Sequence, residues 1–423
     1  CKALGESLKV NQSLKIFNFE ACYGIGNDGC KVLADALKMN QTLTSISFAC
    51  CRTIREEGWK ALAEALKMNG ALTSINFKCC DGIGDESCKA LGESLKVNET
   101  LASLDFSLCD KIGDQGCRAL ADALKVNKVL KNINFSCCIS VGGAGFQALY
   151  EALEKNQTLT TLGLQACYGL GAAVFNALCQ RLETNQALTS ISFAGCECVG
   201  DEGCKVLSEA LKINQALTSI DLSSCQRIGD EGCKALAEGL EVNKVLKRLL
   251  LSRCERIGEE GCKALGQLLK INQVLTTIDL ACCERIGDEG CTALAKGLEV
   301  NQALTKLDLA HCEVGEEGCK ALAVSLQRNK ALTSLTLRGN NFHDGGIDEL
   351  VKMLKLNTTL LKLDLGYSGN DKVVRERLKE NAVLRSVTIP MVLSNPVLLE
   401  SAEGPDKMQE IPNEMKDIIV SYL

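Results

Sequence analysis

An asparagine recurs along this sequence at a fixed interval, and that interval constrains the fold more than any other feature. Eleven asparagines are evenly spaced, because the interval from Asn11 to Asn40 is repeated without change up to Asn301. Two further steps, each one position shorter, reach Asn357, and a last and still shorter step reaches Asn381. The period divides residues 1–389 into about fourteen copies of one unit. It therefore predicts a stacked array of repeats instead of a single globular core.

Each unit has a strand-like part followed by a helix-like part. In the unit that begins at Leu217, Ile220 and Leu222 alternate with other residues, as a strand with one buried face requires. In the following segment four residues recur at the spacing of one helical face: Cys233, Leu236, Ala237 and Leu240. Asp230 suits the start of this helix, where unpaired backbone N–H groups favour negative charge. Asn243 suits the left-handed conformation that often ends a helix.

These repeats resemble the leucine-rich-repeat family. The strand part reads Leu-x-x-Leu/Ile-x-Leu/Phe-x-x-Cys, and the helix part begins Ile-Gly-Asp-Glu-Gly-Cys and ends Leu-Lys-x-Asn. This is most similar to the long-repeat subclass typified by ribonuclease inhibitor and the Ran GTPase-activating proteins, with the cysteine variant seen in many F-box proteins. The resemblance implies an α/β fold, a right-handed solenoid shaped as a horseshoe. It places a parallel sheet on the concave face and helices on the convex face.

Most of the 26 cysteines fall into two columns of the repeat. Eleven of them follow the strand, from Cys22 to Cys312, and Asn340 continues that column. The second column opens the helix, and in three units an aromatic residue replaces the cysteine: Trp59, Phe146 and Phe175. A column that accepts Trp and Phe is a packing position, so we interpret these cysteines as small buried hydrophobes with free thiols.

The pattern offers no metal site. Zinc sites need closely spaced cysteine or histidine pairs, and the two histidines of the chain are His311 and His343. We therefore expect no metal and no cofactor. A protein with many unpaired buried thiols is typical of a reducing compartment, so we expect an intracellular, most simply cytoplasmic, location.

Composition argues against several classes of function. The net charge is −6 and aromatic residues make up 4% of the chain, which disfavours nucleic-acid binding. No apolar run is long enough to cross a bilayer, and the first residues do not resemble a signal peptide. We find no phosphate-binding glycine loop and no nucleophile motif. The sequence therefore predicts a protein without enzymatic activity that binds another protein, and neither nucleic acid nor a membrane.

The resemblance implies that the partner binds residues projecting from the strands and the loops that follow them. In early units these strand positions are small and neutral, as at Ser74 and Ser103. The ninth unit differs, because Arg248, Leu250 and Arg253 combine two guanidinium groups with an apolar side chain, which is typical of interface anchors. Seven further candidates are the loop arginines Arg227, Arg256 and Arg285, expected to stack one repeat apart, and Lys306, His311, Arg338 and Tyr367. Alternatively, the loop arginines pair with Glu255 and Glu284 in an ordinary solvated face.

After Ile389 the repeat pattern stops, and we expect residues 390–409 to form a terminal cap and linker. Residues 410–423 have one apolar helical face, formed by Ile411, Met415, Ile418, Ile419 and Leu423. This stretch is similar to the first third of an F-box. Five residues match that motif directly, namely Pro412, Glu414, Ile419, Tyr422 and Leu423, and Ile411 and Met415 match it conservatively. The resemblance implies docking of an Skp-type adaptor here. The alternative is an amphipathic helix that caps the last repeat.

Three more specific functions remain open from the sequence. The first is a substrate-recruiting arm of an SCF-type ubiquitin ligase, in which the array holds a target and the tail docks the adaptor. The second is a GTPase activator of the Ran activator type, although the acidic extension of that group has no counterpart here and no concave Asn or Arg stands out as catalytic. The third is a purely structural scaffold.

Overall fold

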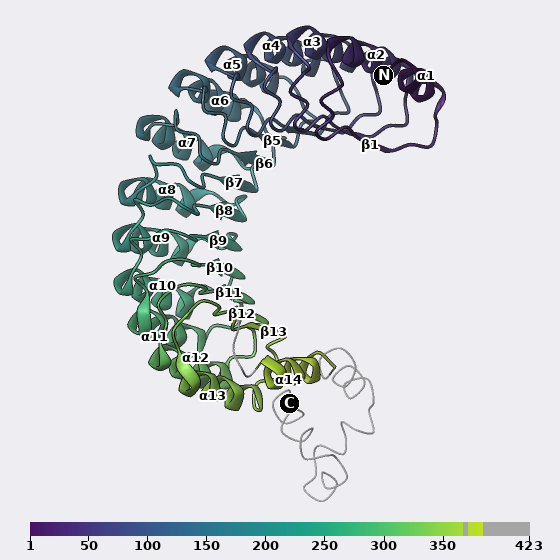
Figure 1. Cartoon of the computed structure of the whole chain (residues 1–423). Helices are drawn as coiled ribbons and strands as arrows, with labels where there is room; N and C mark the ends of the chain where they lie inside the picture. Colours follow the sequence, from purple (N-terminus) through teal and green to yellow (C-terminus); the bar gives the residue numbers. More distant parts are fainter. Residues whose placement is uncertain (367–370, 384–423) are drawn as a thin grey trace, which may run out of the picture. The chain divides into compact units, whose positions relative to one another are not determined.

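The computed structural model describes residues 1–366 and 371–383. These residues form two compact units, Cys1–Arg256 and a second that begins at Ile257. Each unit is built from short strands and helices that alternate along the chain (Figure 1). The predicted cap, linker and C-terminal helix lie outside the described residues.

In the first unit the helices are α1 (Lys2–Val10), α2 (Asn27–Met39), α3 (Glu56–Leu66), α4 (Asp85–Leu95), α5 (Asp114–Leu124), α6 (Gly143–Lys155), α7 (Ala172–Thr184), α8 (Asp201–Ile213) and α9 (Asp230–Val242). Its strands are β1 (Ile16–Asn18), β2 (Ser45–Ser47), β3 (Ser74–Asn76), β4 (Ser103–Asp105), β5 (Asn132–Asn134), β6 (Thr161–Gly163), β7 (Ser190–Ser192), β8 (Ser219–Asp221) and β9 (Arg248–Leu250).

In the second unit the helices are α10 (Glu259–Ile271), α11 (Gly287–Leu298), α12 (Glu316–Arg328), α13 (His343–Leu354) and α14 (Asp371–Val383). Its strands are β10 (Thr277–Asp279), β11 (Lys306–Asp308), β12 (Ser334–Thr336) and β13 (Lys362–Asp364). Helix and strand therefore alternate in every repeat, as the sequence predicts.

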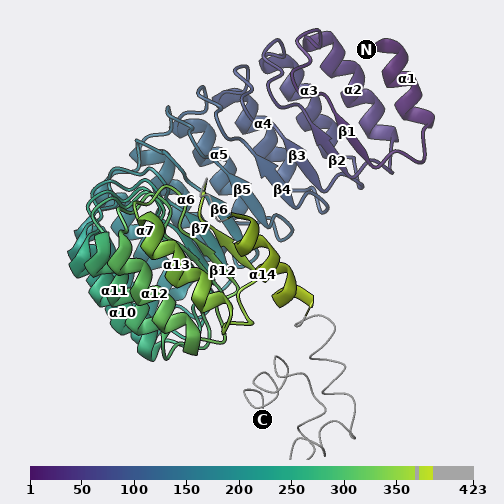
Figure 2. The same cartoon turned by 60° about the horizontal axis from the view of Figure 1, so that its bottom comes forward.

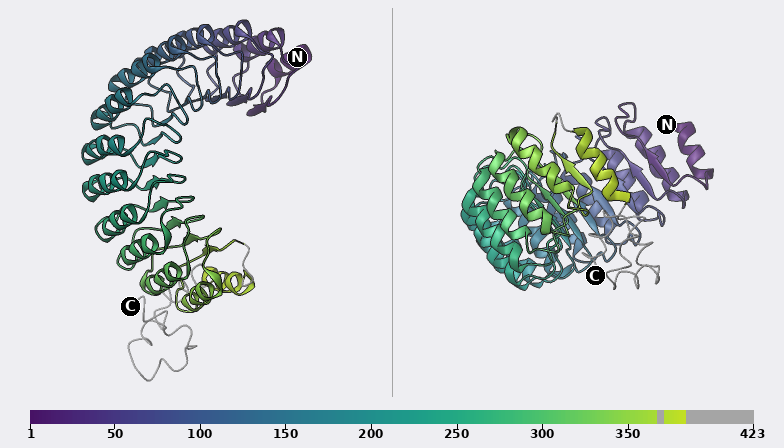
Figure 3. Two further views of the ribbon diagram at one scale, coloured as in Figure 1. Left: turned by 60° about the vertical axis from the view of Figure 1, so that its left-hand side comes forward. Right: turned by 90° about the horizontal axis from the view of Figure 1, so that it is seen from below.

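Within each unit the strands pair in chain order to form a parallel sheet, and the helices cover one face of this sheet (Figure 2). Ser45 of β2 lies opposite Ser74 of β3, and Thr277 of β10 lies opposite Lys306 of β11. The register shift between these strands thus equals the period of the sequence. In each unit the strands line the concave side and the helices the convex side (Figure 3). The predicted α/β solenoid architecture is confirmed.

Aromatic rings form a continuous stack in the core of the early repeats. Five phenylalanines from successive repeats lie nearly parallel, with ring centroids 5.6, 6.4, 5.4 and 5.7 Å apart: Phe19, Phe48, Phe77, Phe106 and Phe135. Trp59 of α3 meets Phe48 and Phe77 edge-on, at 5.5 and 5.3 Å. Parallel and edge-on contacts are both favourable for aromatic rings, so this stack couples neighbouring repeats.

The repeated asparagines form a buried hydrogen-bond ladder. The side-chain oxygen of Asn127 accepts the N–H groups of Val129 and Leu130, at 2.9 and 2.7 Å. Its amide nitrogen donates to the carbonyls of Leu95 and Asn98 in the preceding repeat, at 2.7 and 3.2 Å. Among the described residues the same four bonds form, with small differences in length, at Asn40, Asn69, Asn98, Asn156, Asn185, Asn214, Asn243, Asn301, Asn329 and Asn357.

The expected left-handed conformation of these asparagines is wrong. Asn156 has φ −86° and ψ 118°, and Asn243 has φ −67° and ψ 128°, both in the extended region. The extended backbone carries the chain away from the helix toward the next strand, while the side chain hydrogen-bonds to the preceding repeat. The asparagine is therefore selected for its four hydrogen bonds and not for its tolerance of positive φ.

The first cysteine column also links successive repeats. The buried thiol of Cys80 donates to the carbonyl of Phe48 at 3.1 Å, and Cys109 donates in the same way to Phe77 at 3.1 Å. Asn340 takes this role at the end of the column, with its amide 2.7 Å from the carbonyl of Leu309. In the second column Trp59, Phe146 and Phe175 are buried at the cysteine position. The interpretation of both columns as packing positions is confirmed for the buried members, whereas Cys1 and Cys22 at the open edge are exposed.

Four aspartates at helix starts cap the helix of the next repeat. Asp85, the first residue of α4, accepts the N–H groups of Gly113 and Gly116 at the start of α5, both at 2.8 Å. The same pair of bonds links three other helices to the next one, through Asp114, Asp201 and Asp288. The sequence predicted an effect on the aspartate's own helix, but the carboxylate also pairs N–H groups that would otherwise lack partners one repeat later.

Two repeats in the middle of the first unit lack this cap. Helix α6 begins with Gly143 and α7 with Ala172, and neither residue has a side-chain acceptor for the helix that follows. The starts of α7 and α8 therefore depend on backbone hydrogen bonds alone, such as that from Phe175 N–H to the carbonyl of Gly171 at 2.9 Å. We expect these two repeats to be the weakest junction of the first unit.

We predict that Asn127→Ala lowers the free energy of unfolding by about 2–4 kcal/mol, because two buried N–H groups and two buried carbonyls lose a partner. The neighbouring Lys128→Ala serves as the control, since Lys128 is exposed and should change stability by less than about 0.5 kcal/mol. Urea unfolding followed by circular dichroism measures both changes. Equal effects of the two substitutions would contradict the ladder's structural role.

We also predict that Asp85→Ala costs about 1 kcal/mol, the usual loss when a helix cap is removed. Asp85→Asn should retain most of the stability, because an amide oxygen can perform the same role. Asn27 already does so, accepting the N–H of Arg55 at 2.7 Å before α3. The same urea experiment tests this, and a large loss in the asparagine variant would show that the negative charge is what matters.

Candidate functional site

The predicted anchor cluster lies on and just after strand β9. Arg248 is exposed, Leu249 is buried and Leu250 is half-buried, so the first and third residues of the strand face outward. Arg253 follows in a left-handed conformation, with φ 59°, and its side chain is exposed. We define Arg248, Leu250 and Arg253 as the β9 cluster.

The left-handed residue that follows each strand is a regular feature of the repeat. Its φ lies between 49° and 71° in every repeat from Ala21 to Gly339. The residue type at this position varies, as Cys50, Cys79, Leu108 and Arg253 show. In the first unit its backbone N–H bonds to the carbonyl one residue before the same position in the next repeat, as from Cys79 to Ser107 at 2.8 Å. The same bond from the Ser224 N–H reaches the carbonyl of Ser252, the residue before Arg253, at 2.6 Å.

The loop arginines occupy one register position in the repeat. Arg227 forms a backbone bridge with Gly200, and Arg256 forms the same bridge with Gly229. In the second unit Arg285 has the equivalent bridge to Gly258. The predicted one-repeat spacing is therefore present for Arg227 and Arg256 within the first unit.

The alternative, that these arginines are neutralised by neighbouring glutamates, applies in part. A guanidinium nitrogen of Arg227 lies 4.0 Å from a carboxylate oxygen of Glu197, which is not the glutamate that the sequence suggested. Within residues 1–366 and 371–383, Arg256 and Arg285 form no ion pair, and the same holds for Arg248 and Arg253. These guanidinium groups are therefore available to another molecule.

In the second unit the predicted residues are exposed but more widely spread. Lys306 begins β11, and Arg338 follows β12. The backbone N–H of His311 donates to the carbonyl of Arg338 at 2.9 Å. The imidazole of His311 lies so close to Gly339 that a Cβ there would be 2.2 Å from the ring. Tyr367 lies outside the described residues, as do the adaptor-docking candidates Ile411, Pro412, Glu414, Met415, Ile419 and Leu423.

The concave face of the first unit has a hollow that sequence reasoning missed. It has a volume of about 480 Å³, extends from β4 to β8 and is bounded at one end by Leu250. Gly163 of β6 lies within it, between Asn134 of β5 and Ser192 of β7, which are its register partners. The side chain of Asn134 occupies the place that a Cβ at Gly163 would take. The signal was in the sequence, since Gly163 interrupts a column of polar side chains.

The hollow is lined by polar groups, including two carboxylates. Asp105 accepts a hydrogen bond from the amide of Asn134 at 3.1 Å, and Asp221 accepts one from the hydroxyl of Ser192 at 3.0 Å. Asp105 and Asp221 each also accept a backbone N–H two residues later, at 2.9 and 3.0 Å, which fixes their side chains. The floor of the hollow can thus accept hydrogen bonds from a ligand that carries amide or cationic groups.

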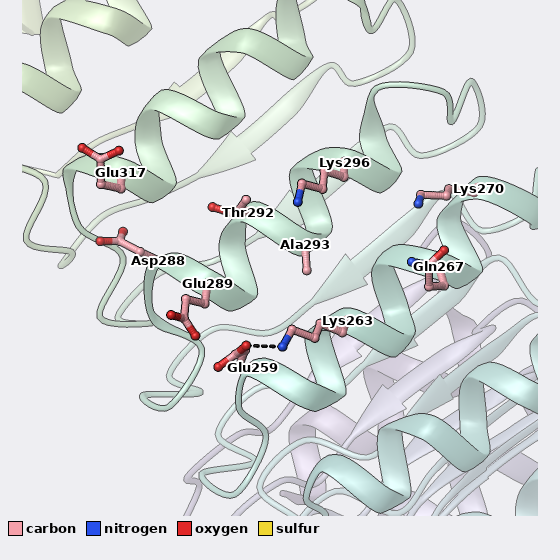
Figure 4. Close-up of a pocket in the computed structure, with 10 residues that line it drawn as sticks. All are labelled: Glu259, Lys263, Gln267, Lys270, Asp288, Glu289, Thr292, Ala293, Lys296 and Glu317. Atoms are coloured by element: carbon pink, nitrogen blue, oxygen red, sulfur yellow. Dashed lines mark ion pairs between the residues drawn. The ribbon is translucent and has the colours of Figure 1, made fainter.

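A second groove of about 470 Å³ lies on the convex side, between α10 and α11 (Figure 4). Lys263 projects from α10 and pairs with Glu259, and also with Glu260 at 2.9 Å. These hydrogen bonds raise the pKa of Lys263 above its ordinary value. The positive charge of Lys263 is therefore already paired with carboxylates of its own helix. Such pairs are typical of an ordinary solvated helical face and do not indicate a binding site.

The buried cysteines are poor nucleophiles and poor metal ligands. Burial raises the pKa of Cys30 and of Cys138 to about 12, so both thiols are protonated at neutral pH. Among the described residues, no group of three or more His, Cys, Asp or Glu side chains is placed to hold a metal ion. In the same part of the chain no helix is long and apolar enough to cross a membrane.

The sequence matches the family described as Leucine Rich repeat in eight segments: 71–92, 97–121, 184–208, 214–237, 242–266, 272–295, 300–323 and 328–351. The gap from 122 to 183 contains α6 and α7, whose helix starts lack the aspartate. A search of functionally characterised proteins found no match.

The solved structures that are similar to this chain include the following three. Leiomodin-1 Actin-Binding Site 2 is 23% identical and covers 44% of this chain and 93% of its own, with a TM-score of 0.32. A chain of the Rad7 and Elc1 complex from yeast is 19% identical and covers 80% and 89%, with a TM-score of 0.45. A chain of the TLR13–ssRNA13 complex is 20% identical and covers 78% of this chain and 40% of its own, with a TM-score of 0.49.

Family membership rests on the sequence match and on the repeat geometry. The matched segments run across both compact units, and each contains a strand and the first part of the helix that follows it. The register shift between paired strands reproduces the period of the sequence in space. The chain belongs to the leucine-rich-repeat family.

Proposed function

We propose that this chain is a non-enzymatic module that binds a protein partner on the concave face of its first unit, with the β9 cluster as the anchor. The observation that carries the proposal is that Arg248 and Arg253 are exposed without an ion pair among the described residues, beside a half-buried Leu250. Arginine and large apolar side chains are the usual energetic centres of protein interfaces. A guanidinium group recognises carboxylates and carbonyls through several N–H donors at once.

The hollow extends this surface away from β9. Leu250 lines one end of it, so a partner held by the β9 cluster reaches the hollow without a gap. Asp105 and Asp221 give the floor negative charge, whereas Arg248 and Arg253 give the cluster positive charge. The surface is therefore complementary to a segment with acidic residues facing β9 and amide or basic residues facing the hollow.

We predict that Arg248→Ala combined with Arg253→Ala weakens partner binding by at least about 2 kcal/mol, or about thirtyfold in Kd, as expected of interface anchors. The partner is first captured from a native extract on the immobilised wild-type chain and then titrated against each purified variant. The control is Ser45→Ala combined with Ser74→Ala, because both serines lie on strands outside the hollow.

Circular dichroism should show that both double variants retain the fold, since the exchanged side chains project from the sheet. If the serine variant loses binding and the arginine variant does not, the contact surface lies on the early repeats and the β9 cluster is not the anchor.

A finer form of the proposal is that the array recruits a substrate for an SCF-type ubiquitin ligase, with an Skp-type adaptor docked at the C-terminus. It is supported by the resemblance of residues 411–423 to the start of an F-box, above all Pro412, Ile419 and Leu423. This segment is separate in sequence from the β9 cluster, so adaptor and target can be tested independently.

We predict that the full chain binds a purified Skp-type adaptor in isothermal titration, and that a chain ending at Pro390 does not. Ile419→Asp in the full chain should also abolish the binding, because it places a charge on the apolar face. Adaptor binding by the shortened chain, or by neither, would contradict the ligase proposal. Stimulation of GTP hydrolysis by Ran in a parallel assay would instead support the activator alternative.

A further inference from the structure

Two cysteines outside the packing columns lie in adjacent repeats, just after the C-terminal ends of two paired strands. Cys50 and Cys79 occupy the left-handed position after β2 and β3, with φ of 60° and 59°. Both are half-buried, in contrast to Cys51 and Cys80, which follow them and are fully buried. In the next repeat this position is filled by Leu108. Within the first unit, Cys50 and Cys79 are therefore the pair of cysteines that occupy this position in adjacent repeats.

The backbone fixes the separation of the two residues. The preceding strands pair in parallel with Ser45 opposite Ser74, and the N–H of Cys50 donates to the carbonyl of Lys78 at 2.8 Å. Neighbouring strands lie about 4.7–4.9 Å apart, and a disulfide accepts Cα separations of about 4.4–6.8 Å. The Cys79 side chain is one of the groups that raise the pKa of Cys50, so the two thiols are close enough to interact. A bond between them therefore needs little movement of the backbone.

The surroundings distinguish the two thiols chemically. A guanidinium N–H of Arg52 donates to the sulfur of Cys79, 3.4 Å away, so this thiol lies beside a positive charge. Asp81 offsets part of this charge, because its carboxylate is 3.7 Å from the guanidinium. The pKa of Cys50 is raised by partial burial, by its hydrogen bond to Cys79 and by the negative charge of Glu20, although Arg52 opposes this. Cys79, the thiol in contact with the guanidinium group, is thus placed to react first, with Cys50 beside it.

We propose that Cys50 and Cys79 form an oxidisable dithiol that closes to a disulfide between the second and third repeats when the protein meets a peroxide. The thiolate of Cys79 attacks one oxygen of hydrogen peroxide, the O–O bond breaks, and hydroxide leaves, giving a sulfenic acid. The thiol of Cys50 then attacks this sulfur and releases water. The two thiols lose two electrons in total, and the peroxide is reduced by the same two electrons.

This dithiol is independent of the proposed partner-binding surface, which lies at β9. The disulfide would be a covalent link between two repeats that otherwise interact through packing, hydrogen bonds and ion pairs such as Arg52–Asp81. It would form at the sheet edge, on the column that also carries Arg253. Reduction by a thiol such as dithiothreitol restores the two free cysteines.

The test treats the full chain with limiting hydrogen peroxide, blocks the remaining thiols with N-ethylmaleimide and analyses unreduced tryptic peptides by mass spectrometry. Cys137 is a matched internal control, because it has the same left-handed position and half-buried side chain but Leu108 and Ala166 as column neighbours. We expect a loss of two thiols per chain, in a peptide that links residues 39–52 to residues 79–89, while Cys137 remains free.

Single variants assign the bond, since Cys51 and Cys80 lie in the same tryptic peptides. Both Cys50→Ser and Cys79→Ser should abolish the cross-link. Cys50→Ser alone should leave a sulfenic acid on Cys79 that reacts with dimedone. Arg52→Gln should slow the oxidation several-fold, and Arg52→Lys should preserve more of the rate because it keeps the charge.

The proposal is overturned if Cys50 and Cys79 are oxidised no faster than Cys137, or if the linkage persists in the Cys50→Ser and Cys79→Ser variants. Circular dichroism of each serine variant checks that the fold is intact. A cross-link that forms in the wild type at the same rate in 6 M urea would also contradict it, because the rate should depend on the folded edge of the sheet.

Discussion

The asparagine ladder is the interaction on which the rest of this structure depends. A buried asparagine can form up to four hydrogen bonds, and here all four are made, two within its own repeat and two to the repeat before it. The turn from helix to strand and the docking of one repeat on the next are therefore set by the same side chain. Replacing it by an apolar residue would leave backbone groups without partners where water cannot reach them.

The repeat architecture could be predicted from the sequence because the relevant signals are local and repeated. The constant spacing of the asparagines fixes the register of the strands, and the alternation of apolar residues fixes which strand face is buried. The roles of the individual polar residues were harder to predict. Asn243 was expected to adopt a left-handed conformation and Asp230 to act on its own helix, since sequence patterns describe a single repeat. The partners of such side chains lie one repeat away.

In the candidate site, too, some features could be predicted from the sequence and others could not. Arg248, Leu250 and Arg253 could be selected from the sequence because they depart from a column of small residues. Gly163 departs from its column in the same way, but the hollow itself could not be predicted from it, because the hollow is lined by side chains from several adjacent strands. The contact of Cys50 with Cys79 was also beyond prediction, since it arises from the left-handed residue that places both thiols at the edge of the sheet.

Three kinds of hydrogen bond between repeats share one direction, from a donor in the later repeat to an acceptor in the earlier one. The asparagine amide donates to carbonyls 32 and 29 residues earlier, the first-column thiol donates to a carbonyl 32 residues earlier, and the amides at a helix start donate to an aspartate 28 and 31 residues earlier. In every case the acceptor precedes the donor. A ribosome makes the chain from its N-terminus, so each repeat that emerges finds the acceptors of these three kinds of bond already in place. The array can thus be completed one repeat at a time, in the order in which it is translated.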